Sequence, residues 1–522
     1  MSGVSVPRTL ASRSPAPPGA RPDATPPACR RRPAAPPACA LSATARLVRE
    51  PLACTPAPQV VLRLLSAERL PFALCGAWAG GGAIVGSEPL AVADVADDPF
   101  EILDLLPGVD ASAVAGIDPG IDAAGSPSAS AVPGVDAPRG RQAAGAASAP
   151  VGGGWFGWLG FRLSARVEDV PLAPWRPVAL PDFHLAYYDH VLRRDLAGRW
   201  WFEALETEAR REALAARREH LARLLARAAG ERAPRPRSAP RALELERGDA
   251  AHHLDAVADC RARIASGEIF QANLCLRLEG LFDGTAAELL GSALSRISPP
   301  YAAAFDTPAG AIASLSPELF LRRRGRDVVT GPIKGTLERE RDPVRAAAAL
   351  RALRRSAKDA AEHVMIVDLM RNDLGRVCEY GTVQAPRRPS AEAHPGVWHL
   401  VSYVRGRLRA QVGDAQLLRA TFPPGSVTGA PKVQSLKVIA RLERCGREVY
   451  TGSVGFSSPV AGLELSVAIR TLELCAGRLW LGAGGGIVAD SDPRRELKEA
   501  LAKARPIAAA VGARVRVRAG AR

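Results

Sequence analysis

The pattern of apolar and polar residues predicts a chain rich in short strands. Alternating stretches typical of half-buried strands occur at 70–74, 83–89, 183–194, 198–205, 269–277, 301–306, 311–314, 318–323, 327–330, 381–385, 399–408, 450–456, 463–474 and 479–484. Helical spacing of apolar residues occurs at 60–65, 100–106, 207–229, 252–266, 343–352, 357–369, 434–444 and 493–504. Strands come in runs with helices grouped between them, which predicts an α+β chain with a mostly antiparallel sheet.

Three stretches without this pattern divide the chain. Residues 1–55 are rich in proline, alanine and arginine, and we expect a disordered tail there. Residues 111–154 are low in complexity and predict a surface insert without a packing role. Together with a Pro/Arg linker at 232–240, these stretches predict an N-terminal lobe at 56–230 and a second lobe at 243–510.

Composition narrows the class of protein. The net charge of +15 permits nucleic-acid binding, but the tail holds much of it and no stripe interleaves aromatic with basic residues. No apolar run approaches the roughly 18 residues of a membrane span. Nine cysteines without a C-x-x-C pair favour a reducing cytoplasm over a disulfide framework or a structural zinc site. The tail is also arginine-rich and acid-poor like a transit peptide, although its prolines interrupt any amphipathic helix.

Lys334 draws attention because lysine is rare in this chain. The 69 basic residues include only six lysines, and one of them stands in the turn Gly331-Pro332-Ile333-Lys334-Gly335-Thr336. Arginine replaces lysine wherever only charge is needed, but it cannot replace an amine that must lose its proton and attack carbon. The residue is therefore a candidate nucleophile, and the alternative is an ordinary exposed cation.

Two further constellations are candidates for ligand binding. Asp359 and Glu362 share one helix face, as do Glu496 and Glu499, and two such pairs facing each other would suit Mg²⁺. The alternative is two exposed acidic faces. A glycine-rich run at 482–486 follows a predicted strand, and its backbone amides could hold a carboxylate or phosphate. It lacks the spacing of a dinucleotide fingerprint, and the loop at 424–432 lacks that of a P-loop.

In combination, the sequence motifs of this chain resemble those of the chorismate-utilising enzymes. This family includes the large subunits of anthranilate synthase and aminodeoxychorismate synthase and the isochorismate and salicylate synthases. The resemblance is strong over about 243–510 and weak over 59–205. Its motifs are S-P-E-L-F at 316–320, G-P-I-K-G-T at 331–336, A-E-H-V-M-I-V-D-L at 361–369, R-N-D-L-G at 371–375, H-L-V-S at 399–402, P-P-G-S-V-T-G-A-P-K at 423–432, Y-T-G at 450–452, A-I-R-T at 468–471 and G-A-G-G-G at 482–486. It implies large, mostly antiparallel sheets packed as a sandwich with helices outside.

Two positions favour aminodeoxychorismate synthase component I within this family. The residue after Pro-Ile is typically Ala in anthranilate synthases and Lys in aminodeoxychorismate synthases, and here it is Lys334. Isochorismate-type enzymes carry a water-activating Lys where this chain has Gln271. The alternatives are an anthranilate synthase component I, an aminodeoxychorismate synthase of secondary metabolism and, on charge alone, a nucleic-acid-binding protein.

The resemblance implies roles for named residues. Lys334 would add to chorismate, Glu318 would protonate the departing hydroxyl, and Thr336 and His399 would line the ring. Mg²⁺ would be held by Glu362 and Glu499, with Asp359 and Glu496 nearby. The expected substrate contacts are Gln271, Gly335, Tyr450, Arg470, Gly482, Ala483 and Gly484. A separate glutamine amidotransferase subunit would supply ammonia for 4-amino-4-deoxychorismate, the precursor of para-aminobenzoate and folate.

The chain departs from the family pattern at three places. Asp359 stands where relatives often have Glu, which weakens its role as a direct ligand. Ala502 replaces the family's Asn before the last helical lysine. The string at 64–67 reads L-L-S-A rather than L-L-E-S, which argues against feedback by tryptophan.

Overall fold

The structure is a computed structural model that describes residues 44–110, 148–172, 180–228, 240, 242–338, 342, 348, 351, 357–394 and 397–518. At 247, 336–338, 357–359, 361, 393, 394 and 397 the description covers the backbone only. Most of the predicted tail and insert, and the predicted helix at 343–352 but for residues 348 and 351, fall outside the described residues.

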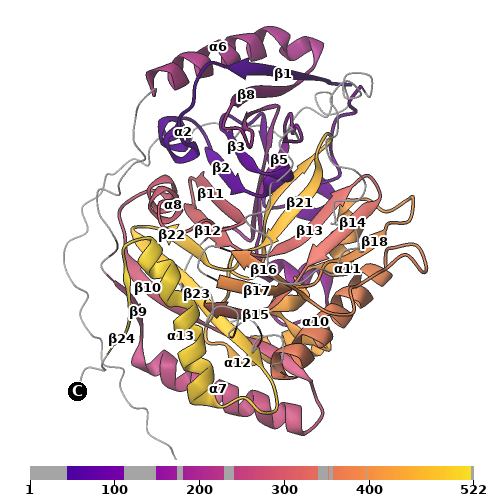
Figure 1. The fold of residues 1–522 in the computed structure, drawn as a ribbon, viewed down its shortest axis with the longest axis vertical. Coiled ribbons are helices and arrows are strands. Elements are labelled where there is room, and N and C mark those ends of the chain that lie inside the picture. The colour runs from indigo at the N-terminus through magenta and orange to yellow at the C-terminus, as the bar shows by residue number, and fades with distance from the viewer. Residues whose placement is uncertain are drawn as a thin grey trace, which may run out of the picture. The chain divides into compact units, whose positions relative to one another are not determined.

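Two large sheets carry the fold (Figure 1). Within the described residues the first has 13 strands. Its order is β1 (Arg46–Leu52), β8 (Trp200–Glu206), β7 (His190–Arg194), β3 (Gly82–Gly86), β2 (Phe72–Gly76), β11 (Tyr301–Thr307), β12 (Gly310–Ser316), β22 (Thr471–Cys475), β23 (Arg478–Ile487), β10 (Gln271–Leu281), β9 (Ala242–Leu245) and β24 (Arg514–Val517), with β19 (Gly429–Ala430) beside β10.

The second sheet has eight strands among the described residues, and a third has three. The order of the second is β18 (Val404–Arg407), β14 (Asp327–Gly331), β13 (Leu319–Arg324), β21 (Gly462–Val467), β20 (Ser453–Ser458), β5 (Gly154–Leu159), β6 (Phe183–Tyr188) and β4 (Ala91–Val92). The small sheet has the order β15 (Ile333–Glu338), β17 (Val397–Val401) and β16 (Ser390–His394). Pairing is antiparallel except between β9 and β24, so the expected α+β fold with mostly antiparallel sheets is confirmed.

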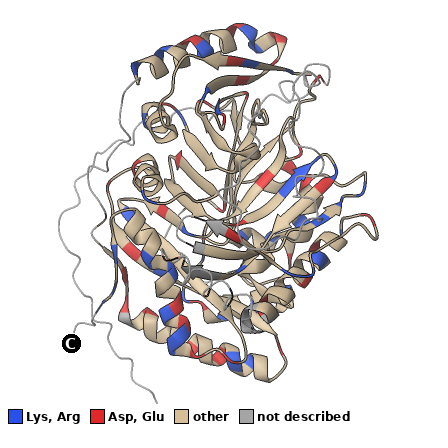
Figure 2. Cartoon of the chain, in the orientation of Figure 1, with Lys and Arg blue, Asp and Glu red and all other residues tan. Residues whose placement is uncertain are grey.

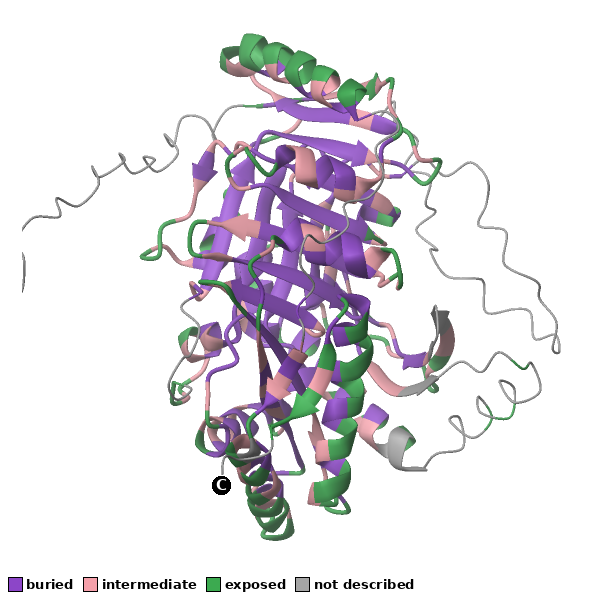
Figure 3. Cartoon of the chain, turned by 90° about the vertical axis from the view of Figure 1, so that its left-hand side faces the viewer, coloured by how far each residue is buried: buried purple, intermediate pink, exposed green. Residues whose placement is uncertain are grey.

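An aromatic core joins the two large sheets. Phe72 of the first sheet stacks on Phe156 of the second, with ring centroids 4.4 Å apart. Phe156 in turn stacks on Phe456, and Phe72 on Phe305. All four side chains are at most 2% exposed, and Figure 3 shows the buried strands at the centre. The aromatic run at 155–161 is therefore part of the core.

Helices cover the outer faces of the sheets. The helices of the described residues are α2 (Pro58–Leu65), α3 (Pro99–Ile102), α5 (Ser164–Val167), α6 (Arg211–Arg227), α7 (Arg247–Ala265), α8 (Ala286–Leu294), α10 (Ala357–Gly375), α11 (Asp414–Thr421), α12 (Lys432–Leu442) and α13 (Pro493–Ala510). Apolar residues of α13, such as Leu501 and Ile507, share one core cluster with β10 and β23. Met370 and Leu374 of α10 pack in a second cluster with β13 and β18. These packings bring α10 and α13 to the two sides of the small sheet in Figure 1.

Three stretches predicted as single strands each break and change sheet. The stretch at 183–194 becomes β6 and β7 around Asp189, the stretch at 399–408 becomes the end of β17 and β18, and the stretch at 463–474 becomes β21 and β22. The strands on both sides of the breaks at 189 and 470 are almost fully buried. The apolar pattern therefore continues through each break and does not reveal the corner. The predicted strand at 381–385 is wrong: it makes one isolated bridge, from Gln384 to Arg405.

The predicted tail and insert are also too long. Residues 46–52 form β1, which pairs along its whole length with β8. At the other gap, Ser148 is buried and donates to the Gly81 carbonyl, and Gly154 begins β5. Each large sheet contains a block of strands from either predicted lobe, joined by the pairs β2–β11 and β20–β5. The expected boundary near residue 240 therefore does not separate the sheets.

Charged residues lie mainly on the outer helices. Figure 2 shows basic and acidic positions mixed along α6 and α7, while the inner strands are largely uncharged. On α6, Arg223 pairs with Glu219 one turn earlier. In the part of the chain that the structure describes, no helix is long and apolar enough to cross a membrane.

Candidate active site

Lys334 lies in β15 of the small sheet, facing α10. Its Nζ atom is 3.9 Å from Oε2 of Glu362, and both side chains are about 15% exposed or less. The register of β15 against β17 shifts between Lys334 and Thr336. Gly335 sits at this bulge with φ of 78°, a conformation that glycine adopts without strain. The turn therefore fixes the direction of the lysine through its backbone.

The environment of Lys334 favours the neutral amine. Burial lowers the pKa of Lys334, and the positive charge of Lys503 lowers it further. The carboxylates of Glu362, Glu318 and Glu499 act in the opposite direction. Because the net shift is downward, more of the lysine is unprotonated and nucleophilic near neutral pH than for an exposed lysine.

Glu318 belongs to the same site, and its pKa is raised whereas that of Lys334 is lowered. It precedes β13, is 4% exposed, and burial raises its pKa to about 7 against opposition from Ser426, Lys334 and Arg470. Its backbone is fixed because Ser316 donates to the Val467 carbonyl at 2.6 Å and Val467 donates to the Glu318 carbonyl at 3.0 Å. A carboxyl group that stays partly protonated at neutral pH is suited to general acid catalysis.

Gln271 completes the group around Lys334. The residue is fully buried, and neither polar atom of its amide has a hydrogen-bond partner among the described residues. A methyl group at Gly486 would lie 2.2 Å from Nε2 of Gln271 and 3.3 Å from Nζ of Lys334. Only a glycine at 486 leaves room for both side chains, and a buried amide without protein partners is one that a ligand can satisfy.

The glycine-rich run has one open edge. Pairing between β22 and β23 ends at Leu472 and Leu481, whereas pairing between β10 and β23 continues to Ile487. Along 482–486 one edge of β23 therefore has no strand partner in the described part of the chain, and alternate amides point there. Gly482 also admits Tyr450, because a methyl group at 482 would lie 2.3 Å from the tyrosine ring. Ala483 itself packs in the core of the first sheet.

Tyr450 and Arg470 border the same region. Tyr450 is 5% exposed, and the Cys275 thiol donates to its hydroxyl at 3.8 Å. Arg470 forms the corner between β21 and β22 with φ of 54°, and its charge interacts with Glu318. Burial lowers the pKa of Arg470, yet a guanidinium stays charged and can bind a substrate carboxylate with two parallel hydrogen bonds.

Two carboxylates of α13 approach the end of β23. A methyl group at Gly485 would lie 3.5 Å from Oε2 of Glu496 and 3.9 Å from Oε1 of Glu499. Glu496 is 6% exposed and accepts from Ser491 at 2.6 Å. Glu499 pairs with Lys503 at 2.9 Å, and Lys503 also donates to the Gly484 carbonyl.

These carboxylates fit Mg²⁺ in their chemistry. Glu362, Glu496 and Glu499 offer only oxygen, the donor that Mg²⁺ takes in proteins. Glu362 and Glu499 also both interact electrostatically with Lys334, which places them at one site. In the described residues no three His, Cys, Asp or Glu side chains are grouped closely enough to hold a metal ion. The side chain of Asp359, the remaining predicted ligand, lies outside the described residues.

For Thr336 and His399, the two residues predicted to line the substrate ring, that role stays a prediction. The Thr336 side chain also lies outside the described residues. His399 is buried at 1% exposure and pairs in register with Thr336, while its neighbour Leu400 pairs with Lys334. Because successive strand residues face opposite sides, His399 and Leu400 lie on opposite faces of the small sheet.

The sequence profile of the chorismate binding enzymes matches residues 123–509. The chain belongs to the chorismate binding enzyme family. It is 37% identical over 359 residues to an aminodeoxychorismate synthase component 1 of Klebsiella aerogenes, which covers 68% of this chain and 76% of that protein. It is 36% identical over 377 residues to an anthranilate synthase component 1 of Streptomyces coelicolor, covering 69% and 73%.

The fold of this chorismate binding enzyme agrees with that family. The crystal structure of anthranilate synthase component I from Streptococcus pneumoniae superposes with a TM-score of 0.63 at 25% identity, covering 89% of this chain and 93% of that one. The expected family and sandwich of antiparallel sheets are thereby confirmed.

Three functional candidates in this chorismate binding enzyme escaped the sequence patterns. Ser426 lies close enough to the Glu318 carboxyl group to lower its pKa, Lys503 pairs with Glu499, and His363 and Ser402 share a hydrogen bond of 2.6 Å. His363 and Ser426 stand within the family motifs at 361–369 and 423–432, but no periodic pattern marks either residue individually. The spacing of Lys503, four residues after Glu499, is the signal that could have found it.

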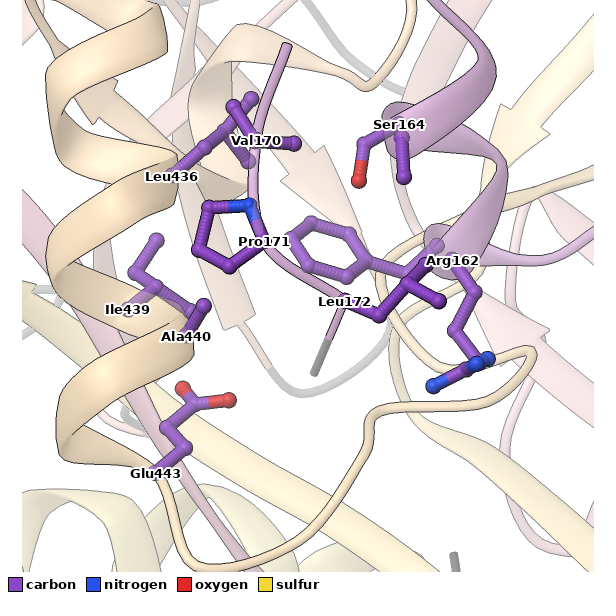
Figure 4. A pocket seen from close by; sticks show the side chains of 11 residues that line it. Arg162, Ser164, Val170, Pro171, Leu172, Leu436, Ile439, Ala440 and Glu443 are labelled. Carbon is purple, nitrogen blue, oxygen red and sulfur yellow. The ribbon is translucent and has the colours of Figure 1, made fainter. Parts of the chain in front are cut away.

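Two pockets lie outside the group of predicted catalytic residues. One, of about 1400 Å³, lies between α10 and the segment 383–389, and His363 and Ser402 line it. The other is small and mostly apolar, between α12 and the segment 161–172 (Figure 4). Glu443 borders it, and its carboxylate bonds to Arg447 and to the Cys275 amide. None of the predicted catalytic side chains lines either pocket.

Proposed function

We propose that this chain is aminodeoxychorismate synthase component I, which converts chorismate and ammonia to 4-amino-4-deoxychorismate and water. One observation supports this most directly: a buried lysine with a lowered pKa shares a site with a buried glutamate whose pKa is raised to about 7. An amine nucleophile and a proton donor are the two groups that amination through a lysine adduct requires.

The proposed reaction proceeds in two displacements. Neutral Lys334 Nζ forms a bond to C2 of the ring while the double bonds shift and the C4–O bond breaks. Glu318 gives its proton to the departing hydroxyl, which leaves as water. Ammonia then forms a bond to C4, the double bonds shift back, and the C2–N bond to Lys334 breaks. The lysine leaves as the neutral amine, and the ammonium group formed at C4 gives one proton back to the Glu318 carboxylate.

Polar groups at the open edge of β23 would orient the substrate. Arg470, Tyr450 and the amides of 482–484 supply donors for its carboxylates, and the unpartnered amide of Gln271 faces the reacting ring. Glu362 and Glu499 would hold Mg²⁺, with Glu496 and Asp359 nearby. The ion would supply positive charge to bind a ring carboxylate and polarise the ring.

We further propose that ammonia comes from a glutamine amidotransferase subunit, that the product serves para-aminobenzoate and folate synthesis, and that the enzyme works in the cytoplasm. The relative from Klebsiella aerogenes is named as component 1, which supports a second component. The seven cysteines within the described residues are all free thiols, which supports a reducing compartment.

The identity of the product tests the proposal. Purified protein with chorismate, Mg²⁺ and an ammonium salt at mildly alkaline pH is expected to form 4-amino-4-deoxychorismate, measured by mass and retention time. Adding a glutaminase partner with glutamine should give the same product without ammonium. If the protein forms neither 4-amino-4-deoxychorismate nor anthranilate from chorismate, the proposal is contradicted.

The second candidate is anthranilate synthase component I, which the relative from Streptomyces coelicolor supports. In that case ammonia would attack C2 itself, and Lys334 would have no covalent role. Anthranilate from the wild-type protein would establish this alternative and leave the family assignment intact.

Removal of metal is expected to abolish the reaction and Mg²⁺ to restore it. Glu362→Gln and Glu499→Gln should each weaken Mg²⁺ binding by about 10–100-fold or more, measured by calorimetry and by the Mg²⁺ concentration that restores half activity. Glu219→Gln on the exposed face of α6 is the control and should match the wild type. Unchanged Mg²⁺ binding in both site variants would contradict the proposed ligands.

A further inference from the structure

The turn that carries Tyr450 lies over one face of the first large sheet. Across β23, Arg277 of β10 pairs with Gly482, and Glu473 of β22 pairs with Trp480. Residues two apart on a strand share a face, so Arg277, Glu473 and Gly482 face the same side of the sheet. The Tyr450 ring lies on that side as well, because a methyl group at Gly482 would be 2.3 Å from it.

The Glu473 side chain binds the backbone of this turn directly. Its Oε1 atom accepts from the amides of Val449 and Tyr450, each at 2.9 Å. Its Oε2 atom accepts from Arg277, and another nitrogen of the same guanidinium donates to the Gly446 carbonyl at 2.8 Å. The buried pair of Glu473 and Arg277 therefore holds the turn at two separate places.

The backbone of the turn needs such support. Glu448 and Thr451 have φ of 53° and 66°, in the left-handed region that residues other than glycine seldom adopt and that persists only where the surroundings hold it. The Glu448 carbonyl accepts from the Phe161 amide at 2.8 Å, and the Thr451 amide donates to the Ala468 carbonyl at 2.8 Å. Between these two bonds the turn is held by the Glu473 carboxylate.

The hydroxyl end of Tyr450 is less firmly held than its backbone. Its hydrogen bond from the Cys275 thiol is 3.8 Å long, and a thiol is a weak donor. The place of the hydroxyl is therefore set by the packing of the ring over Gly482 and by the direction that the turn gives to the side chain.

We propose that Glu473 is a positioning residue for substrate binding: it fixes the Val449 and Tyr450 amides and thereby aims the Tyr450 hydroxyl at the substrate. This inference rests on the proposed function, in which Tyr450 binds a carboxylate of chorismate. Glu473 itself is 1% exposed and acts only through the turn.

The first test measures chorismate affinity with Mg²⁺ and without ammonium. The full-length protein carries Lys334→Ala so that bound chorismate does not react. Glu473→Gln leaves a single acceptor oxygen, so either Arg277 or the two amides lose their partner. We expect the Kd of chorismate, measured by calorimetry, to rise about tenfold. An unchanged Kd would overturn the positioning role.

A double-mutant cycle shows whether the effect passes through the tyrosine. Tyr450→Phe removes the hydroxyl and should weaken chorismate binding by itself. Because Glu473 acts through that hydroxyl, Glu473→Gln should then cause little further loss. A second tenfold loss in the Tyr450→Phe protein would contradict the proposal. If Glu473→Gln does not fold, Arg277→Lys takes its place, since one ammonium replaces the fork that joins Glu473 to the Gly446 carbonyl.

Amide exchange tests the anchor without any substrate. In Glu473→Gln the amides of Val449 and Tyr450 should exchange with solvent deuterium at least about tenfold faster than in the wild type, measured by mass spectrometry on peptides that cover 446–451. Wild-type exchange at these two amides would show that Glu473 does not fix the turn, and it would overturn the inference.

Glu203 offers a matched control, because it makes the same kind of contacts far along the sheet. It is fully buried, and its Oε2 atom accepts from the amides of Val151 and Gly152 at 2.7 Å and 3.2 Å. Its Oε1 atom is 3.0 Å from Nε of Arg49. Glu203→Gln should speed exchange at 151–152 and leave the Kd of chorismate unchanged. An equal rise in Kd would assign the effect of Glu473→Gln to general destabilisation.

Product analysis decides the proposed function separately. In the enzyme with Lys334 intact, Glu473→Gln should raise KM for chorismate about tenfold and change kcat by less than about threefold, because it weakens binding of a group that does not react. Anthranilate from the wild type would refute the proposed function, while a loss of affinity that disappears with Tyr450→Phe would still support the role of Glu473. Unchanged exchange at Val449 and Tyr450 would refute that role whichever product forms.

Discussion

Lys334→Ala is expected to lower kcat for amination by about a thousandfold or more, the scale on which loss of a covalent nucleophile acts. The expected cause is loss of the C2 adduct, not loss of substrate binding, so KM should change far less than kcat. The site should keep its fold, since the contact of Lys334 with Glu362 is 3.9 Å long, too long for a strong hydrogen bond.

Lys334→Arg separates nucleophile from charge. Arginine keeps a positive charge beside Glu362 but is not deprotonated in proteins. We expect this variant to be as inactive as Lys334→Ala. Near wild-type activity in Lys334→Arg would show that the site needs a cation there, and it would contradict covalent catalysis.

Trapping the adduct is the direct measurement. Wild-type protein given chorismate and Mg²⁺ without ammonium should gain the mass of chorismate less one water, and peptide mapping should place it on Lys334. Lys437→Ala, on α12, is the matched lysine control and should form the adduct like the wild type. An adduct that forms equally in Lys334→Ala would assign the nucleophile to another residue.

The elements of the fold follow from local pattern, but the sheets do not. Alternation identifies strands at 301–306, 311–314, 318–323 and 327–330, and the structure has a strand at each. It does not reveal the corners at Asp189 and Arg470, because both sides of each corner alternate alike. Which strand belongs to which sheet is decided by pairing partners far away in the sequence.

Strand β1 shows how pairing overrides composition. Its sequence R-L-V-R-E-P-L has three charges and Pro51, which read locally as part of the tail. In the structure it is the last strand of the sheet, where proline is tolerated on an edge, and Leu47 is buried. The main-chain bonds to β8 and one buried face are enough to order it.

The candidate site was predictable in its parts and not in its assembly. Lys334 and Gln271 are 63 positions apart, and only the space left by Gly486 brings their side chains together. Ser426 stands in the motif at 423–432, but a motif does not reveal how near its residues lie to Glu318. A sequence pattern predicts which residues could react, whereas the distances among them depend on the packing of α10 and α13 against the sheets.

Glu318→Gln is expected to lower kcat by about 10²–10⁴-fold, the usual contribution of general acid catalysis. Glutamine keeps the shape of the side chain but has no proton to give. In the wild type the protonated form is lost as the pH rises through about 7, so kcat/KM should fall above that pH. The residual rate of Glu318→Gln should lack this fall.

Stability should change in the opposite direction, and this separates a catalytic from a structural role. Burial raises the pKa of Glu318 from 4.5 to about 7. Between these values the folded chain keeps a proton that the unfolded chain has lost, so this group's contribution to stability falls as pH rises through that window. The loss is on the order of 3 kcal/mol, and a neutral glutamine avoids it.

We therefore expect Glu318→Gln to have the higher Tm at pH 8 and a Tm equal to the wild type near pH 4.5, measured by calorimetry on both proteins. A glutamate kept for packing would be destabilised by replacement at every pH. A variant that is more stable at alkaline pH yet inactive would mean that the buried carboxyl group costs the fold stability at the pH where the enzyme works. That cost is the physical signature of a group retained for proton transfer, and an inactive variant with lower Tm at both pH values would contradict it.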